Sequence, residues 1–246
     1  MVESRIIPSL LLKEDSLVKT IRFKSPNYIG DAINTVRIFN ELEVDEILLL
    51  DIEATKKKRT INFNLLEQIA NECFMPLAYG GGIRSVEEAK KIISIGFEKI
   101  VVNSIAFEHP EVVIEIAKAI GSQSVVGAID ITKNFFGKKI ISSYSNTKFH
   151  SFSFNEWALK LQEYGVGEIL INCVYNEGTW SGLDLQLIDQ LSPKIRIPII
   201  LQGGANEIEN IQKAFEKGVS AVGVGNMVVY QKKGMGVLIN TKKIKR

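Results

Sequence analysis

The sequence predicts one (β/α)8 barrel that spans residues 1–246 and is built from two similar halves. Eight short apolar runs alternate with longer amphipathic stretches, and residues of the first half recur in the second half at a constant spacing. The length and the hydrophobic content of 46% allow a core of the size typical of such a barrel. We therefore expect a single α/β domain in which helices surround a closed parallel sheet.

The apolar runs have the length of buried strands. They occupy residues 5–12, 46–51, 76–79, 99–103, 125–130, 168–172, 198–201 and 221–225. Amphipathic stretches between them predict helices over residues 31–42, 64–73, 85–95, 110–120, 154–164, 185–191 and 208–217. Near-continuous apolar strands separated by helices indicate a parallel sheet covered by helices. Eight such units favour a closed barrel, because an open doubly wound sheet usually has fewer.

An internal repeat supports the two halves. The segment Glu46-Ile47-Leu48 matches Glu168-Ile169-Leu170, and Pro76 with Gly81-Gly82 matches Pro198 with Gly203-Gly204. Every pair is 122 positions apart, close to half of the 246-residue chain. Similar but unrelated βα units would not keep one spacing, so the repeat predicts a doubled half-barrel.

Composition excludes several classes of partner. Thirty basic against 28 acidic side chains leave a formal charge of +2, too little to indicate nucleic acid or a membrane surface. The first residues lack the apolar run of a signal peptide, and no stretch approaches the roughly 18 apolar residues of a membrane span. We expect a cytoplasmic protein.

The cysteines and histidines predict neither a disulfide nor a metal site. Cys73 and Cys173 lie far apart without the spacing of a zinc site, and His109 and His150 are isolated. We expect no metal and no cofactor.

Glycines after two strands predict phosphate sites. Gly80-Gly81-Gly82 and Gly203-Gly204 each precede a helical stretch, where glycine admits a ligand to the backbone and helix N–H groups bind anions. A tight turn would explain one such pair, but further donors recur 122 positions apart, at Asn103-Ser104 and Gly225-Asn226. We expect two facing phosphate sites at the C-terminal ends of the strands, and a phosphorylated small molecule with a phosphate at each end.

Seven short motifs carry a family resemblance. They are Arg5-Ile6-Ile7-Pro8, Leu50-Asp51-Ile52, Gly80-Gly81-Gly82-Ile83, Gly121-Ser122-Gln123, Ala128-Ile129-Asp130, Glu177-Gly178-Thr179 with Ser181-Gly182, and Gly203-Gly204-Ala205. From residue 5 to about residue 230 the chain resembles the cyclase subunit of imidazole glycerol phosphate synthase. The resemblance implies a glutaminase partner on the N-terminal face of the barrel. It also implies that ammonia crosses the barrel to a bis-phosphorylated substrate, which is cleaved and cyclised.

The resemblance gives roles to charged residues at the strand starts. In the family, one arginine, one lysine and two glutamates form the entrance of the ammonia path, and the matching residues are Arg5, Glu46, Lys99 and Glu168. Two further residues match the interface with the glutaminase, Glu98 and Gln123, although the family commonly has aspartate at the former. Without the resemblance, charges at strand starts would be read as solvated surface groups.

The catalytic pair of the family is incomplete. The family uses two aspartates as general acid and base, because ring closure needs proton donation and proton removal. Asp130 matches one of them, but Leu11 stands at the other and cannot transfer a proton. The next carboxylates, Glu14 and Asp15, are three and four residues further on, so a substitute role would require a rearranged strand end.

Two further features resemble a divergent branch of the family. The last helix is shortened to residues 229–233, and Leu11-Leu12-Lys13 precedes Leu17-Val18-Lys19-Thr20. The branch accompanies surface-polysaccharide pathways, where the glutaminase and the barrel are thought to supply ammonia to a separate sugar amidotransferase that makes acetamidino groups. Residues 14–30 are expected to form a polar loop, either a plain surface loop or a lid over the phosphate sites. We expect Lys19 and Gly178 to join these sites.

Three functions remain open at this stage. The first is a cyclase-like barrel that supplies ammonia for sugar amidation. The second is a working cyclase of histidine biosynthesis that uses Asp130 with a substitute acid, and the third is an independent barrel isomerase or synthase of another sugar phosphate. The charged residues at the strand starts argue against the third function, and Leu11 argues against the second.

Overall fold

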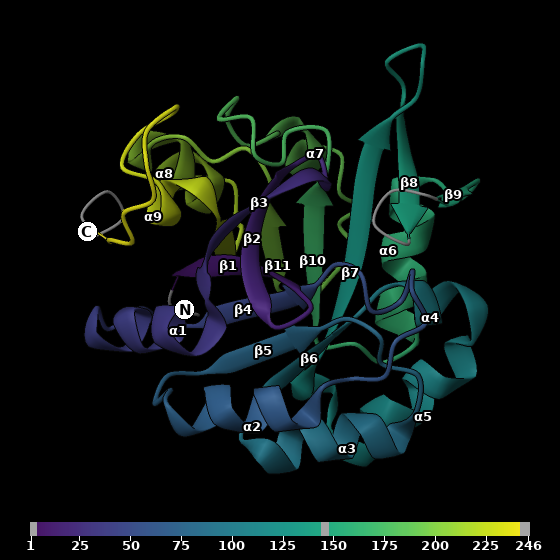
Figure 1. The fold of residues 1–246 in the computed structure, drawn as a ribbon. Helices are drawn as coiled ribbons and strands as arrows, with labels where there is room; N and C mark the ends of the chain where they lie inside the picture. The colour runs from purple at the N-terminus through teal and green to yellow at the C-terminus, as the bar shows by residue number, and fades with distance from the viewer. Residues whose placement is uncertain (1–3, 144–147, 242–246) are drawn as a thin grey trace.

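The structure, a computed structural model that describes residues 4–143 and 148–241, contains a closed barrel of eight parallel strands (Figure 1). The strands are β1 (Arg5–Lys13), β4 (Ile47–Asp51), β5 (Leu77–Gly80), β6 (Lys99–Val102), β7 (Val125–Lys133), β10 (Glu168–Cys173), β11 (Ile199–Gln202) and β12 (Ala221–Val224). Each pairs in parallel with the next, and pairings of β7 with β10 and of β12 with β1 close the ring. The predicted fold class is confirmed.

Helices follow the strands and lie outside the ring. They are α1 (Ala32–Glu41), α2 (Phe63–Asn71), α3 (Val86–Ile95), α5 (Pro110–Ile120), α6 (Phe154–Glu163), α7 (Gln186–Asp189) and α8 (Ile208–Glu216), with two short helices, α4 (Ser104–Glu108) and α9 (Asn226–Val229). Polar caps set several starts: the side chains of Asp31, Asn62 and Ser85 each accept a backbone N–H of the first turn. Ser153 and Glu156 form a reciprocal capping box at α6.

Alternate residues of each strand point into the barrel. Toward the N-terminal ends of the strands, the interior is a small apolar cluster. Its members are Ile7, Leu48, Ala78, Val101, Val126, Ala128, Leu170, Ile200 and Ala221. The strands' other faces pack against the helices in a much larger core. Because side chains alternate along a strand, positions two residues beyond the interior cluster also face inward, at the C-terminal mouth of the barrel. Asn103, Asp130, Asn172 and Gln202 hold such positions.

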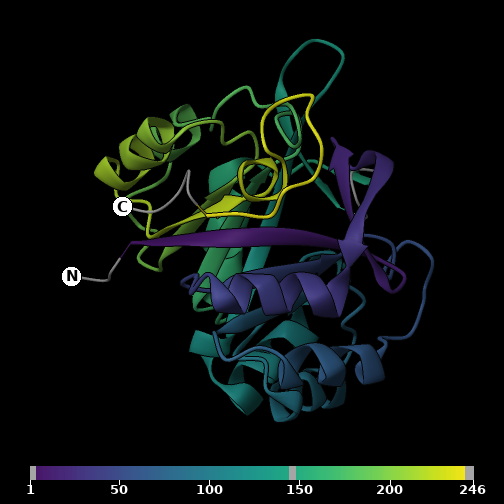
Figure 2. The same ribbon diagram turned by 60° about the vertical axis from the view of Figure 1, so that its left-hand side comes forward.

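The expected loop at residues 14–30 is wrong, because these residues form an antiparallel hairpin of β2 (Ser16–Ile21) and β3 (Lys24–Asp31). β2 also pairs with the end of β1, and Leu17 and Val18 are buried. Arg22 and Phe23 both have φ of 57°, the backbone of a two-residue hairpin turn without glycine. Figure 2 shows the hairpin standing at the end of β1.

A second hairpin follows β7 at the equivalent place in the other half. β7 runs on to Lys133 and pairs with the antiparallel strand β8 (Lys139–Ser143), which pairs in turn with β9 (Lys148–His150). The chain end also differs from the expected helix at residues 229–233. α9 ends at Val229, and Tyr230 makes an antiparallel bridge to Val237.

The two halves match in backbone detail at the spacing of 122. Gly81 and Gly203 have φ of 127° and 108°. A Cβ atom at either position would lie 2.6 or 2.5 Å from a carbonyl oxygen, that of Asp51 or Cys173, and these two residues are again 122 apart. The short helices α4 and α9 also begin at equivalent residues, Ser104 and Asn226.

Candidate functional site

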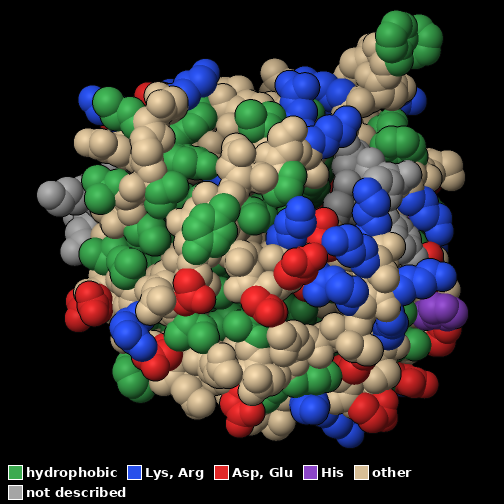
Figure 3. All heavy atoms as spheres, in the orientation of Figure 1, with side chains coloured by type: hydrophobic (Ala, Val, Ile, Leu, Met, Phe, Trp, Pro, Cys, Tyr) green, Lys and Arg blue, Asp and Glu red, His purple; other side chains and the backbone are tan. Residues whose placement is uncertain are grey.

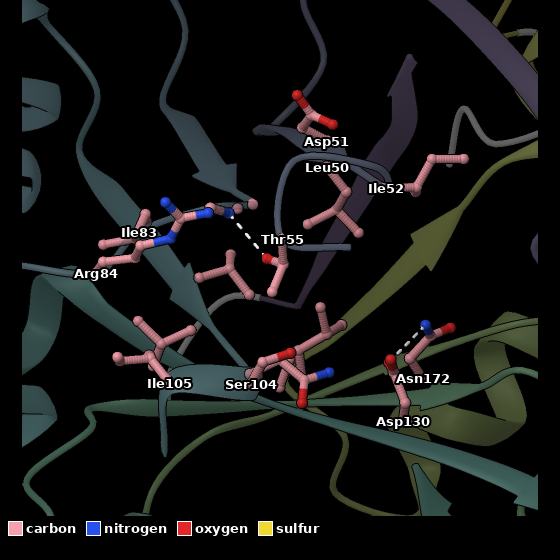
Figure 4. Close-up of a pocket in the computed structure, with 18 of the residues that line it drawn as sticks. Leu50, Asp51, Ile52, Thr55, Ile83, Arg84, Ser104, Ile105, Asp130 and Asn172 are labelled. Carbon is pink, nitrogen blue, oxygen red and sulfur yellow. Dashed lines mark hydrogen bonds between the residues drawn. The ribbon is translucent and has the colours of Figure 1, made fainter. Parts of the chain in front are cut away.

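Two adjoining pockets open at the C-terminal ends of the strands. The larger has a volume of about 490 Å³ and is lined by residues after β4, β5 and β6 together with Asp130 and Asn172 (Figure 4). The smaller, of about 30 Å³, lies at the ends of β1, β11 and β12. The predicted phosphate residues divide between them. Gly82, Asn103 and Ser104 line the larger pocket, and Lys19, Gly178, Gly203, Gly204, Gly225 and Asn226 line the smaller one.

The larger pocket is shaped by the turn after β5. Gly81 and Gly82 both have positive φ, and the N–H of Gly82 donates to the hydroxyl of Thr55 at 3.1 Å. Asn103 precedes α4 and Ser104 begins it. In Figure 4, Ser104 and Thr55 lie on facing sides of the pocket. The pocket therefore combines hydroxyl and amide side chains with a glycine-rich turn.

The smaller pocket is built around Lys19 on β2. The side chain is 5% exposed, and burial lowers the pKa of its ammonium group, an effect that the carboxylate of Glu177 partly opposes. Lys19 Nζ lies directly over Gly225, where a side chain would collide with it. Asn226 Nδ2 donates to the carbonyl of Gly178 at 3.0 Å. An anion in this pocket would thus lie between the buried ammonium group of Lys19 and a backbone of glycine residues, which it can approach closely.

Asp130 lies at the inner end of the larger pocket, on β7. It is 6% exposed, and Asn172 Nδ2 on the neighbouring strand donates to its Oδ1 at 3.0 Å. Burial raises the pKa of Asp130 to about 6, although hydrogen bonds from Asn172 and Asn103 favour the charged form. A carboxyl group that titrates near neutral pH is suited to general acid–base work.

Leu11 stands where the family has its second catalytic aspartate. In the described part of the chain, no carboxyl group takes its place opposite Asp130. Leu11 is 1% exposed and lines the smaller pocket from β1, which stands across the ring from β7. Glu14 and Asp15 lie in the turn between β1 and β2. Lys57 Nζ is 3.7 Å from the exposed Glu14 carboxylate, and Asn62 donates to Asp15 at 3.0 Å. Both carboxylates are therefore held outside the barrel mouth.

At the opposite end of the barrel, the four charged residues form a closed ring. Arg5 donates to Glu46 and to Glu168. Lys99 Nζ donates to each glutamate at 3.1 Å. Positive and negative groups alternate around the opening, and directly above them lies the apolar interior. Two cations and two carboxylates thus neutralise each other across the floor of the barrel.

The expected interface residues lie on the rim beside this ring. Glu98 comes directly before β6, Gln123 lies in the 3-10 turn at residues 122–124 that precedes β7, and both are exposed. These strands are neighbours in the sheet, so the two side chains belong to one stretch of the N-terminal face.

Several residues of the mouth were not predicted. Asp51, at the end of β4, holds Arg59 at 3.1 Å, and Glu177 accepts hydrogen bonds from the β2–β3 hairpin. Asn172 and Gln202 face inward from β10 and β11. Their positions are 122 residues beyond Leu50 and Gly80, so a full self-comparison of the sequence would have marked them as a difference between the halves.

Basic side chains lie close to the barrel mouth. Figure 3 shows Lys and Arg side chains gathered right of centre, with Asp and Glu side chains among them. Lys58 and Arg84 are among the residues that line the larger pocket. Among residues 4–143 and 148–241, no three His, Cys, Asp or Glu side chains are grouped so that they could hold a metal ion. The helices of the same ranges are all too short or too polar to cross a membrane.

Comparison with known proteins places the chain in a family. Residues 5–234 match the family described as histidine biosynthesis protein. A Pseudomonas aeruginosa protein named "Putative imidazole glycerol phosphate synthase subunit hisF2" is 45% identical over 98% of this chain and 96% of its own length. A Vibrio vulnificus protein named in the same way, as hisF3, is 40% identical over 98% and 93%. The imidazole glycerol phosphate synthase subunit HisF of Petrotoga mobilis is 38% identical over 90% and 88%. The chain therefore belongs to the histidine biosynthesis protein family, as a relative of the HisF cyclase subunits of imidazole glycerol phosphate synthase.

Proposed function

We propose that this barrel receives ammonia at its N-terminal end, conducts it to its C-terminal end, and binds a bis-phosphorylated ligand there. The closed ring of Arg5, Glu46, Lys99 and Glu168 carries this proposal. Four charges converge on an end of the barrel that ordinarily contributes stability alone. The ring seals an apolar interior that leads toward the two pockets, and neutral ammonia can cross such an interior, whereas ions cannot.

The ligand is an elongated molecule with a phosphate at each end. Both pockets combine glycine-rich turns with the start of a short helix, in equivalent places of the two halves. Lys19 adds a cation to one of them. A molecule that occupies both pockets would lie across the barrel mouth, beside Asp130.

The source of the ammonia is a glutaminase subunit that docks on the N-terminal face in the cytoplasm. HisF proteins among the relatives are named as subunits of a synthase, which supports a partner for this chain as well. The exposed Glu98 and Gln123 lie beside the charged ring, where such a partner would cover the entrance. Docking would open the ring and couple glutamine hydrolysis to ammonia entry.

Leu11 argues against cyclisation as the use of the ammonia. Without a carboxyl group at this position, one of the two proton-transfer groups of the family's ring closure is missing. General acid–base groups contribute roughly 10²- to 10⁴-fold each. The resemblance of residues 11–20 to the divergent branch then favours, as acceptor of the ammonia, a separate sugar amidotransferase that makes acetamidino groups for a surface polysaccharide.

Cyclisation by this barrel is the second candidate, and the pKa of about 6 at Asp130 favours it. The two candidates predict different responses to Leu11→Asp. If cyclisation has been lost, the wild-type barrel with ammonium salts turns over the family's substrate poorly, and Leu11→Asp gains activity. Wild-type turnover that matches a HisF protein with both aspartates would instead establish a working cyclase.

The ammonia path is tested with Lys99→Ala in the complex with the co-expressed glutaminase subunit. We expect docking to persist, because Lys99 is inside the ring and not on the rim. Ammonia should escape to solvent, so that free ammonium per glutamate formed rises several-fold over the wild type. Lys217→Ala, which removes an exposed ion pair with Asp189, is the control. Unchanged coupling in Lys99→Ala, or failure to form the complex with any glutaminase subunit, would favour an independent sugar-phosphate barrel.

A further inference from the structure

Two phenylalanines stand at the tip of the β7–β8 hairpin with almost their whole side chains in solvent. Phe135 is 98% and Phe136 90% exposed, the two highest values among the large apolar residues of the described chain. Their rings meet edge to face, with 5.7 Å between the centroids. Figure 1 shows the hairpin extending beyond the helices beside it, and Figure 3 shows apolar side chains at the end of this projection. Adjacent exposed aromatic rings indicate an interaction site.

The turn at the tip has hydrogen bonds of its own. Asn134 Oδ1 accepts the N–H groups of Phe136 and Lys138 at 3.0 and 2.9 Å. The backbone carbonyl of Asn134 accepts the N–H of Gly137 at 2.9 Å. Gly137 has φ of 78°, a conformation that residues with a side chain rarely adopt. The two rings are therefore presented by a turn whose shape is set within the hairpin.

Asp184 fastens the base of the hairpin to the connection between β10 and α7. Its carboxylate lies 2.5 Å from Lys139 Nζ on β8 and also accepts the hydroxyl of Tyr175. On β7, Lys133 Nζ lies 4.4 Å from the centre of the Tyr175 ring. Both strands of the hairpin are thus held at their base. A partner that binds the tip would not have to order the hairpin first, which reduces the entropic cost of binding.

The charge around the tip is basic. No Asp or Glu occurs at residues 131–155, whereas this stretch contains four lysines. Two of them, Lys133 and Lys138, stand on either side of the tip and are exposed. The net charge of +2 of the whole chain does not reveal this local excess. A partner with an apolar pocket for the rings and acidic side chains around it would complement the tip in both respects.

The hairpin stands at the barrel mouth because β7 contributes to both. Asp130 on β7 lines the larger pocket, and Phe135 follows five residues later, about 17 Å away in an extended chain. Other exposed apolar side chains also follow the C-terminal ends of barrel strands: Ile21 and Tyr28 after β1, Phe149 after β7, and Met235, Val237 and Leu238 after β12. Most of the exposed large apolar side chains of the described residues therefore follow the strand ends that carry the two pockets.

We infer that the tip formed by Phe135 and Phe136 docks into an apolar pocket with acidic surroundings on the enzyme that accepts the ammonia. The inference rests on the proposed function, which supplies an acceptor at this end of the barrel. Ammonia that escapes into water takes up a proton at neutral pH and can then no longer attack a substrate. Transfer to a separate enzyme therefore requires that this enzyme cover the barrel mouth, and the hairpin projects from the rim of that mouth.

The test measures binding of the purified barrel to the sugar amidotransferases of the same organism by surface plasmon resonance. Phe135→Ser combined with Phe136→Ser should weaken binding about 10- to 100-fold, since buried aromatic anchors carry much of the affinity of an interface. The thermal midpoint should stay unchanged, because both rings are exposed. Phe74→Ser is the matched control, since it removes an 87% exposed ring that precedes β5, at the other end of the barrel.

The charge around the tip is tested separately. Lys138→Glu should lower the association rate several-fold and make the affinity less sensitive to salt, whereas Lys138→Arg should behave like the wild type. In the complete assembly with the glutaminase subunit, the double serine variant should hydrolyse glutamine at the wild-type rate. Its nitrogen should appear as free ammonium at the expense of the amidated sugar, because the acceptor no longer covers the mouth.

The possible failures are distinguishable. If no sugar amidotransferase binds the wild-type barrel, the proposed destination of the ammonia is wrong and the inference falls with it. If one binds and the double serine variant keeps the affinity, the inference alone is overturned. Sedimentation of the wild type, but not of this variant, with vesicles of phosphatidylglycerol and phosphatidylcholine would then assign the tip to a membrane. Dimers of the wild type that the variant does not form would assign it to a second copy of the chain.

Discussion

Asp130 is a carboxyl group whose surroundings oppose its charge. Burial raises its pKa, and the hydrogen bonds from Asn172 and Asn103 do not fully compensate. In the unfolded chain the same group titrates near pH 4. The folded protein therefore binds more protons than the unfolded chain between about pH 4 and pH 6, and stability falls as the pH rises through this interval.

This titration predicts a pH-dependent effect of Asp130→Asn. The amide has nearly the same shape as the protonated acid but never ionises. At pH 8 the variant should be more stable than the wild type by up to about 3 kcal/mol, the free energy that corresponds to the shift of the pKa. At pH 4 most of this gain should disappear. Urea denaturation at the two pH values measures the difference, and a gain that is equal at both would contradict the raised pKa.

At the residue scale, the sequence predicted groups that act locally and missed groups that act across strands. Gly82 and Gly203 were expected because glycine turns admit an anion to the backbone, and Lys19 was expected from the family resemblance. Asn172 and Gln202 could not, because an amide near a strand end is unremarkable until register places it beside a pocket. The gap opposite Asp130, by contrast, was visible in the sequence as Leu11.

The β2–β3 hairpin is fastened to the loop after β10 by Glu177. Its carboxylate accepts the hydroxyl of Thr20 at 2.9 Å and the N–H of Phe23 at 3.1 Å. Arg22 adds bonds to the carbonyls of Glu177 and Tyr175. A two-stranded hairpin is only marginally stable alone. These contacts therefore keep the β2–β3 hairpin, and Lys19 with it, in place.

Glu177→Ala should therefore loosen the hairpin without unfolding the barrel. Hydrogen bonds to a charged acceptor contribute about 1.5–3 kcal/mol each. Amide exchange over residues 16–31 should accelerate at least tenfold, while β4 and β5 remain protected, as measured by mass spectrometry. Glu14→Ala, at the exposed base of the same hairpin, is the control. A rise spread evenly over the whole chain would mean that Glu177 stabilises the barrel and not the hairpin.

Among the secondary-structure elements, runs of apolar residues predicted the barrel strands closely. The hairpins were not predicted. The predicted run at residues 125–130 corresponds to the start of β7, which continues to Lys133 in order to pair with β8. The β2–β3 turn was missed because Arg22-Phe23 contains none of the residues that usually mark such turns. The apolar pair Leu17-Val18 on β2 was too short to outweigh the polar residues around it.

Considering the whole molecule, two anions should bind, one in each pocket, and Lys19 should strengthen binding only in the smaller pocket. Filling one site at ten times its Kd stabilises the fold by about 1.4 kcal/mol. In a protein of this size that corresponds to roughly 3–6 °C in the thermal midpoint. Lys19→Met should reduce the stoichiometry of inorganic phosphate binding from two to one in calorimetry.

The sign of the Lys19 effect reverses when the anion is absent. Because burial lowers its pKa, the cation destabilises the empty protein below the ordinary pKa of lysine, and stability should increase with rising pH. Lys19→Met should accordingly raise the thermal midpoint without phosphate and reduce the gain with phosphate. Lys217→Met serves as an exposed control. A lower midpoint in phosphate-free buffer would show that Lys19 is stabilised by its neighbours and not strained by burial.

The doubled half-barrel also bears on the direction in which an elongated molecule can lie. Two equivalent halves would accept a molecule with identical ends equally well when it is turned end for end. The aliphatic wall at Leu50 and the amide wall at Asn172 remove this equivalence. A chain with one polar flank then has a single favoured way of turning that flank, toward the amide wall. Unequal walls would thus convert a duplicated cradle into one that distinguishes the two flanks of its ligand.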